Sequence, residues 1–262
     1  MRVARLHRRK RVERTLKTVA SRLRIEWLLG GLIQKVSFVR SVYGPLLYNT
    51  PGDQTFGFCI NGYGPFVSEV IARWDDDFLF LDIGANLGLF SLIAVCNPHC
   101  RQAIAFEPVP EIFNRLRLNV ARNNAAKITP LQGAIVDSTA EEVHLSFNPK
   151  HSGMSRITTD TRHAVRAIAI SAPELDAIVR KASLPILAKI DVEGSEPEVL
   201  SALRRTHFYG RVSGIIIEIS ERNLGAKHAE LLEALRMDDF HEVGRSGGVE
   251  HYDALYRRSV KP

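Results

Sequence analysis

The chain has little cysteine and no long apolar run. Its only cysteines are Cys59, Cys96 and Cys100, too few for a disulfide framework and typical of a chain among reduced thiols. The most apolar stretch near the N-terminus, Trp27–Ile33, is about a third of the roughly 20 residues that a membrane crossing needs. Gln34 and Lys35 interrupt it where a signal peptide would continue to a cleavage site. We therefore expect a cytoplasmic protein whose mature chain starts at about its first residue.

Two common nucleotide-binding fingerprints are also missing. No GxxxxGK followed by Ser or Thr occurs, which excludes a P-loop. A dinucleotide fingerprint GxGxxG would need glycine where the chain has Asn86 and Leu89, which disfavours NAD and FAD.

The positive charge is confined to one part of the chain. The net charge is +6, but residues 1–40 hold twelve Lys or Arg against two Glu, a net +10, so the other 222 residues carry −4. A mildly acidic body offers no evident groove for a phosphate backbone, so we expect no nucleic-acid partner. We divide the chain into a basic arm, residues 1–45, and one α/β domain, residues 46–262.

Within the arm, Val12, Leu16, Val19 and Leu23 recur at helical spacing, which predicts a basic amphipathic helix. Such a helix either packs across the domain or makes peripheral contact with an anionic membrane or an acidic partner. The residues that follow, Tyr48–Gly64, are rich in Gly, Asn and Pro and predict a loop.

From Phe78 onwards, short apolar runs alternate with helical patterns, as in βαβ units around a parallel sheet. The predicted strands are Phe78–Ile83, Gln102–Phe106, Ile128–Ile135, Ile186–Val192 and Gly214–Ile219. The predicted helices are Phe66–Arg73, Leu87–Val95, Pro110–Asn123, Pro197–Arg205 and Ala226–Met237. Further runs predict an inserted β element and a C-terminal hairpin: Val143–Phe147, Ala164–Ile170, His241–Arg245 and Ala254–Arg258.

The sharpest motif is LDIGANLGLF, which places Asp82, Gly84, Asn86 and Gly88 between a strand and a helix. Glycines there allow a tight turn, and the free amides of the helix N-terminus favour electron-rich groups. Glu107 ends the next strand in AFEPVP, where a carboxylate can accept hydrogen bonds from both ribose hydroxyls. A tight turn and a ribose acid without a pyrophosphate fingerprint favour S-adenosylmethionine.

A second motif, AKIDVEGSEPEVL, ends an apolar strand in Asp191 and Glu193. In a doubly wound sheet this strand end lies beside the glycine loop, so both carboxylates should face the cofactor and the reacting group. Lys189 shares a strand face with Asp191 and is expected to pair with it, or to bind substrate. A structural ion pair is the alternative interpretation of these residues.

Taken together, DIGANLGLFSLIA, FEPVP, KIDVEGSEPEVL and IIIEIS resemble the FkbM-type S-adenosylmethionine-dependent methyltransferases in order and spacing, over about Phe56–Ser220. The resemblance implies the class I methyltransferase fold, a Rossmann-like, mostly parallel seven-stranded sheet with an antiparallel last strand and helices on both faces. It also implies methyl transfer to oxygen, commonly a hydroxyl of a sugar, glycolipid or secondary metabolite. The cofactor-binding residues would be Asp82, Gly84, Ala85, Asn86, Gly88, Glu107, Pro108, Ala134 and Asp137.

An aliphatic hydroxyl must lose its proton as the methyl group arrives, which a carboxylate or histidine can accept. The candidates are Asp191, Glu193 and His151, the last in the polar loop segment NPKHSGMSRI, and Glu218 is a candidate for substrate binding. Asp191, Glu193 and Glu218 could instead hold Mg²⁺, although a site without metal is favoured. The sequence is also compatible with RNA or protein methylation, and with a non-catalytic S-adenosylmethionine-binding module docked through the arm.

Overall fold

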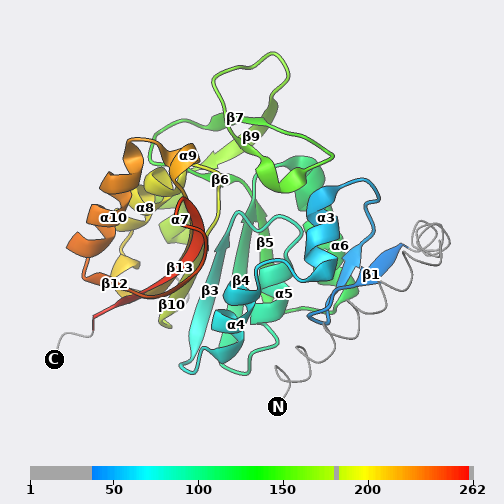
Figure 1. The fold of residues 1–262 in the computed structure, drawn as a ribbon, viewed down its shortest axis with the longest axis horizontal. Helices are drawn as coiled ribbons and strands as arrows, with labels where there is room; N and C mark the ends of the chain where they lie inside the picture. The colour runs from blue at the N-terminus through cyan, green and yellow to red at the C-terminus, as the bar shows by residue number, and fades with distance from the viewer. Residues whose placement is uncertain (1–36, 180–182, 260–262) are drawn as a thin grey trace.

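A computed structural model describes residues 37–179 and 183–259 (Figure 1). The predicted amphipathic helix of the arm lies outside these residues. The end of the arm forms strand β1 (Phe38–Arg40), which pairs antiparallel with β2 (Leu46–Tyr48). In the part of the chain that is described, no helix is both long and apolar enough to span a bilayer.

A seven-stranded sheet with the order β12-β13-β11-β10-β3-β4-β5 forms the centre of the domain. Its strands are β3 (Phe78–Ile83), β4 (Cys100–Glu107), β5 (Ile128–Gln132), β10 (Ile186–Ile190), β11 (Val212–Ser220), β12 (Phe240–Gly247) and β13 (His251–Arg258). The five strands from β11 to β5 are parallel, and β13 runs antiparallel to β11 and β12. This topology confirms the class I methyltransferase fold, with the antiparallel last strand and the C-terminal hairpin.

The central strands are continuous apolar runs because helices cover both faces of the sheet. All six residues of β3 and all five of β10 are buried, including Asp82 and Lys189. A buried charged side chain is costly without a partner of opposite charge or a hydrogen bond. Asp82 and Lys189 find such partners at the edge of the sheet where the parallel strands end. The strands therefore position the site as well as form the core.

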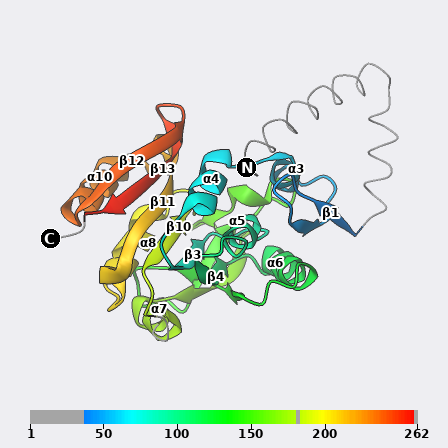
Figure 2. The same cartoon turned by 90° about the horizontal axis from the view of Figure 1, so that it is seen from below.

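Helices pack on the two faces in two separate groups (Figure 2). One face is covered by α4 (Pro65–Arg73), α5 (Leu89–Ala94) and α6 (Pro110–Arg122), and the other by α7 (Ala172–Val179), α8 (Glu196–Arg204) and α10 (Lys227–Met237). A short helix, α9 (Glu221–Leu224), follows β11. The sequence predicted α4, α5, α6, α8 and α10 to within two residues at each end, and missed α7 and α9.

The prediction of a loop over Tyr48–Gly64 is wrong in its middle, because α3 forms there (Gln54–Asn61). The Asp53 side chain accepts a hydrogen bond from the Thr55 amide at the start, and Gly62, with φ of 108°, ends the helix. The turn-forming residues that suggested a loop therefore cap the helix at both ends.

The predicted strand Ile128–Ile135 is also divided, at Gly133, into β5 and β6 (Ala134–Ile135). A Cβ atom at Gly133 would lie 2.5 Å from Ile170 Cδ1, so only glycine allows this close crossing. Strand β6 leaves the main sheet and pairs with β9. The predicted insertion is confirmed as a four-stranded sheet of β6, β7 (Glu142–Ser146), β8 (Arg156–Ile157) and β9 (Val165–Ile170), with the 3₁₀ helix η1 (Ser152–Met154).

Candidate active site

The loop between β3 and α5 turns tightly at three residues with left-handed backbone conformation. Gly84, Asn86 and Gly88 have φ of 80°, 47° and 78°. A Cβ atom on Gly84 would lie 1.9 Å from the Asp191 carbonyl oxygen, and one on Gly88 would lie 2.3 Å from Leu116 Cδ1. Glycine is therefore required at Gly84 by the approach of the β10 backbone, and it is favoured at Gly88 by the left-handed backbone conformation.

Asp82 lies beneath this loop and is fully buried. Its Oδ2 atom accepts hydrogen bonds from the Ser91 amide (3.1 Å) and hydroxyl (2.7 Å), which ties the end of β3 to α5. Its Oδ1 atom lies 3.4 Å from the Lys189 ammonium. Asp82 and Gly88, both predicted to contact the cofactor, therefore support the loop from outside the cleft wall.

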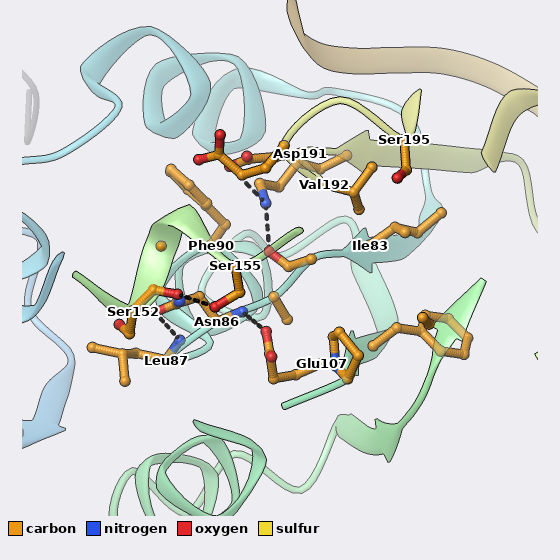
Figure 3. A pocket seen from close by; sticks show the side chains of 18 of the residues that line it. Ile83, Asn86, Leu87, Phe90, Glu107, Ser152, Ser155, Asp191, Val192 and Ser195 are labelled. Atoms are coloured by element: carbon orange, nitrogen blue, oxygen red, sulfur yellow. Dashed lines mark hydrogen bonds and ion pairs between the residues drawn. The ribbon is translucent and has the colours of Figure 1, made fainter. Parts of the chain in front are cut away.

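Glu107 ends β4 and links two backbone segments. Its Oε2 accepts from the Asn86 amide and its Oε1 from the Val109 amide, both at 2.9 Å (Figure 3). Burial raises the pKa of Glu107 to about 7, although the two amides favour the ionised form. A buried carboxylate of this kind can accept further hydrogen bonds from vicinal hydroxyls in the cleft.

The Lys189 ammonium joins the two motifs. It donates to the Gly84 carbonyl oxygen (2.9 Å) and lies 3.2 Å from Asp191 Oδ2, in addition to its contact with Asp82. Burial disfavours its charge, but Asp191 and Asp82 outweigh that effect and raise the pKa of Lys189. Lys189 thus contacts three protein oxygens, one through a hydrogen bond and two through ion pairs, and its contact with Asp191 holds that carboxylate beside the glycine loop.

Three carboxylates meet at the ends of β10 and β11. Asp191, Glu193 and Glu218 present oxygens within 4.8 Å of one another, a spacing at which they could hold a divalent cation. Glu193 has φ of 56°, and the Glu196 carboxylate holds this turn by accepting from the Val192 and Gly194 amides. Such strain in a non-glycine residue is typical of functional turns.

Asp191 raises the pKa values of the carboxyl groups beside it. The charge of Asp191, followed by burial, raises the pKa of Glu218 to about 10, and burial followed by Asp191 raises that of Glu193 to about 7. Asp253 on β13 belongs to the same group, and burial and Asp191 raise its pKa to about 6. His251 Nε2 lies 3.1 Å from Glu218 Oε1 at the outer side. Glu193, Glu218 and Asp253 therefore bind protons more readily than isolated carboxylates do.

A cleft of about 920 Å³ opens to solvent above these strand ends. The predicted residues that line it are Gly84, Ala85, Asn86, Glu107, Pro108, Ala134, Lys189, Asp191 and Glu193. Glu218 lines a smaller adjoining pocket that shares Tyr63, Phe90, Lys189 and Asp191 with the cleft. The structure thus gathers both motifs around one cavity.

Besides Asp82 and Gly88, two more predicted site residues do not line the cleft. Asp137 accepts hydrogen bonds from Ser201 Oγ (2.6 Å) and Arg205 Nη1 (2.7 Å) and does not line the cleft. His151 Nδ1 lies 3.3 Å from Thr55 Oγ1, and its ring packs edge-on against Phe58. Its loop does reach the cleft, but the neighbouring residues Ser152 and Gly153 line the wall and the imidazole does not, because Thr55 and Phe58 engage it on α3.

Several lining residues were not predicted. Thr55, Cys59 and Tyr63 come from α3 and the turn after it, and Ser152, Gly153, Ser155 and Ile157 come from the insertion. Composition suggested a loop in the first segment, and only the polar, glycine-bearing character of residues 148–157 gave any signal in the second. Both segments reach the cleft through tertiary contacts between residues about 100 positions apart.

The fold and this site define the class of S-adenosylmethionine-dependent methyltransferases. The "Methyltransferase FkbM domain" model matches residues 82–244, so the chain belongs to the FkbM methyltransferase family. It is similar to "Hexuronic acid methyltransferase AglP" of Haloferax volcanii, with 31% identity over 165 residues, 61% of this chain and 63% of that protein. It is also similar to "Methyltransferase 1" of Beauveria bassiana, with 25% identity over 58% of this chain and 68% of that protein.

A solved structure of M. capricolum TrmK with S-adenosyl-homocysteine is similar at a TM-score of 0.43 and 12% identity, over 74% of this chain and 67% of that one. The residues of this cleft fit S-adenosylmethionine on their own chemistry. The backbone of Gly84 and Asn86 lines the cleft, Glu107 offers a buried acceptor, and Ala134 contributes only a small side chain to the lining.

Proposed function

We propose that this protein is an O-methyltransferase that methylates a hydroxyl of a sugar, glycolipid or other hydroxylated small molecule. The observation that carries the proposal is the placement of Asp191. Its carboxylate lies at the junction of the cleft and the adjoining acidic pocket, 3.2 Å from an ammonium that also holds Gly84 of the cofactor loop. One buried lysine thus sets the distance between the cofactor loop and the candidate base.

S-adenosylmethionine, when bound, supplies a methyl group activated on a sulfonium centre. The chain's residues must hold the acceptor oxygen in line with the carbon–sulfur bond and exclude water. Asp191 would accept the proton that the acceptor hydroxyl loses when its oxygen is methylated. Glu107 orients the ribose, and Glu193 and Glu218 hold the polar groups of the acceptor near Asp191.

The sugar acceptor is supported by the relative AglP, whose name gives a hexuronic acid as the methylated compound. A hexuronic acid offers both hydroxyl and carboxylate oxygens. The site favours the hydroxyl oxygen, because Asp191 can accept the hydroxyl proton and its charge disfavours a second carboxylate beside it.

The test is methyl transfer from trideuteromethyl-labelled S-adenosylmethionine to a panel of glycosides, followed by mass spectrometry before and after mild alkali. We expect labelled products that survive alkali, because a methyl ether is stable where a methyl ester is hydrolysed. Label lost in alkali would show carboxylate methylation and contradict the hydroxyl proposal. Label that appears only on RNA or protein added to the panel would replace the small-molecule acceptor.

A further inference from the structure

Exposed apolar side chains lie on the two segments that form the outer wall of the cleft, α3 with its following turn and the insertion. Phe58, Tyr63, Met154 and Ile157, here called the rim, are 49%, 38%, 56% and 39% exposed. Phe58 lies on α3 and Tyr63 in the turn after it, while Met154 and Ile157 lie on η1 and β8 of the insertion. Tyr63 and Ile157 also line the cleft, so the rim continues into it. Leaving large apolar side chains in water at a ligand entrance is typical of a binding surface.

Hydrogen bonds join the two segments that carry the rim, the start of α3 and η1. Asp53 Oδ1 accepts from the Ser152 amide (3.2 Å), and Thr55 Oγ1 accepts from the Gly153 amide (2.8 Å). Asp53 is buried and also pairs with Arg115 of α6 at 3.1 Å. These contacts hold η1 against α3 and keep the apolar side chains at the entrance.

One hydroxyl inside the rim indicates a polar ligand group. Ser152 is 2% exposed and lines the cleft, and its Oγ atom makes no hydrogen bond with any residue that the structure describes. A buried hydroxyl without a partner is costly, and a ligand that accepts or donates a hydrogen bond there removes the cost. The apolar entrance therefore leads to an unpaired polar group and then to the carboxylates.

The charges at the inner end of the cleft indicate which ligands it can bind. Asp191, Glu193, Glu218 and Asp253 lie around the reaction end, where the Lys189 ammonium pairs with Asp191. The charge of Asp191 favours the protonated forms of its carboxyl neighbours, so it also disfavours a further anion, whereas a neutral hydroxyl would find hydrogen-bond partners among them.

We infer that the acceptor is a neutral amphiphile, a hydroxylated sugar head joined to an apolar chain that lies across the rim. This inference rests on the proposed function and specifies its substrate class. The sugar head enters past Ser152 toward Asp191, and the chain covers Phe58, Met154 and Ile157 at the entrance. A freely hydrated sugar would leave these apolar side chains uncovered.

The test compares the binding of n-octyl β-D-glucoside, below its micelle concentration, with that of methyl β-D-glucoside to the full chain saturated with S-adenosylhomocysteine. We expect the octyl compound to bind at least about tenfold tighter, because its chain buries apolar surface on the rim. Methyl β-D-glucuronide should bind more weakly than the neutral methyl glucoside. Calorimetry measures all three without requiring turnover.

Variants test whether the rim residues cause the preference for the octyl compound. Phe58→Ser combined with Met154→Ser should remove the octyl preference, and Met237→Ser, an equally exposed apolar residue at the end of α10, should leave it unchanged. Equal binding of octyl and methyl glucosides, no binding of either, or a preference that survives the rim variant overturns the inference. So does a change of oligomeric state in the rim variant with the octyl preference intact, because the rim would then contact a second copy.

The labelled-transfer assay keeps the two proposals apart. Alkali-stable methylation of short-chain glycosides at the same rate as octyl glycosides would support the hydroxyl O-methyltransferase and overturn the amphiphilic acceptor. Tight binding of the octyl glucoside without any hydroxyl methylation would support the amphiphilic ligand and contradict the hydroxyl O-methyltransferase.

Discussion

At the residue scale, the site depends on a few contacts made at strand ends. Lys189, Asp191 and Glu107 were predictable because the carboxyl ends of parallel strands meet at one edge of the sheet, which brings distant motifs together. Ser152 and Tyr63 were not, because nothing local in their sequence records that α3 and η1 pack against each other. His151 shows the same limit, since only the fold reveals that Thr55 and Phe58 engage its ring.

Gly84 provides a test of the close approach between β3 and β10. We expect Gly84→Ala to lower the free energy of unfolding by about 2 kcal/mol or more, because its Cβ would clash with the Asp191 carbonyl oxygen at a positive φ. Urea denaturation measures the change. Gly57→Ala is the control, since Gly57 lies in α3 with open space around it and should gain up to about 1 kcal/mol. Equal stabilities of the two variants would contradict this geometry.

Glu107 should make cofactor binding depend on pH. Its pKa of about 7 means that it is largely protonated at lower pH and loses an acceptor for the ribose hydroxyls. Binding that prefers the ionised form weakens as pH falls through the pKa, by up to about tenfold per pH unit. Calorimetric titration with S-adenosylmethionine on both sides of pH 7 should show this dependence, and Glu107→Gln should bind weakly with a flat profile. A steep profile in the variant would assign the dependence to another group.

At the scale of elements, the strands were predictable and the covering segments were not. Continuous apolar runs identify β3, β4, β10 and β11, because helices on both faces exclude water from them. Helix α3 was missed because its capping residues are those that also occur in loops. The end of β5 was missed because the chain leaves the sheet at Gly133 only as a result of its contact with Ile170, which is distant in sequence. Both segments matter here, since α3 forms part of the cleft wall and Gly133 lines it.

Asp53 should couple α3, α6 and the insertion. We expect Asp53→Ala to lower the free energy of unfolding by about 2–4 kcal/mol, because it removes a helix cap and leaves Arg115 without its buried partner. Glu111→Ala removes the exposed partner of the same arginine and should cost at most about 1 kcal/mol. Chemical denaturation measures both, and equal losses would show that Asp53 does not join the three elements.

The ends of β10 and β11 should work without a metal ion. Lys189 already supplies a positive charge to Asp191, so we expect transfer rates to be unchanged by EDTA and by added Mg²⁺. The labelled-transfer assay measures this on dialysed protein. A rate that disappears with EDTA and returns with Mg²⁺ would instead assign Asp191, Glu193 and Glu218 as cation ligands.

At the scale of the whole molecule, the cleft lies at the edge of a sheet that is typical of the family. Its outer wall consists of two further segments, α3 with its following turn and the insertion, here called the covering segments. The sheet brings the glycine loop and the carboxylates together at one cleft. The covering segments add an apolar entrance and an unpaired hydroxyl, which narrow the choice of acceptor. The cofactor half of the site could thus be predicted from motifs, whereas the acceptor half depends on tertiary structure.

The central claim is that Asp191 accepts the proton during methyl transfer. Its most direct test is single-turnover transfer by Asp191→Asn, compared with the parent chain and with Asp75→Asn, an exposed control. We predict a rate lower by about 100-fold or more in Asp191→Asn, with S-adenosylmethionine bound at nearly parental affinity and Asp75→Asn unaffected. A parental rate in Asp191→Asn would contradict the account.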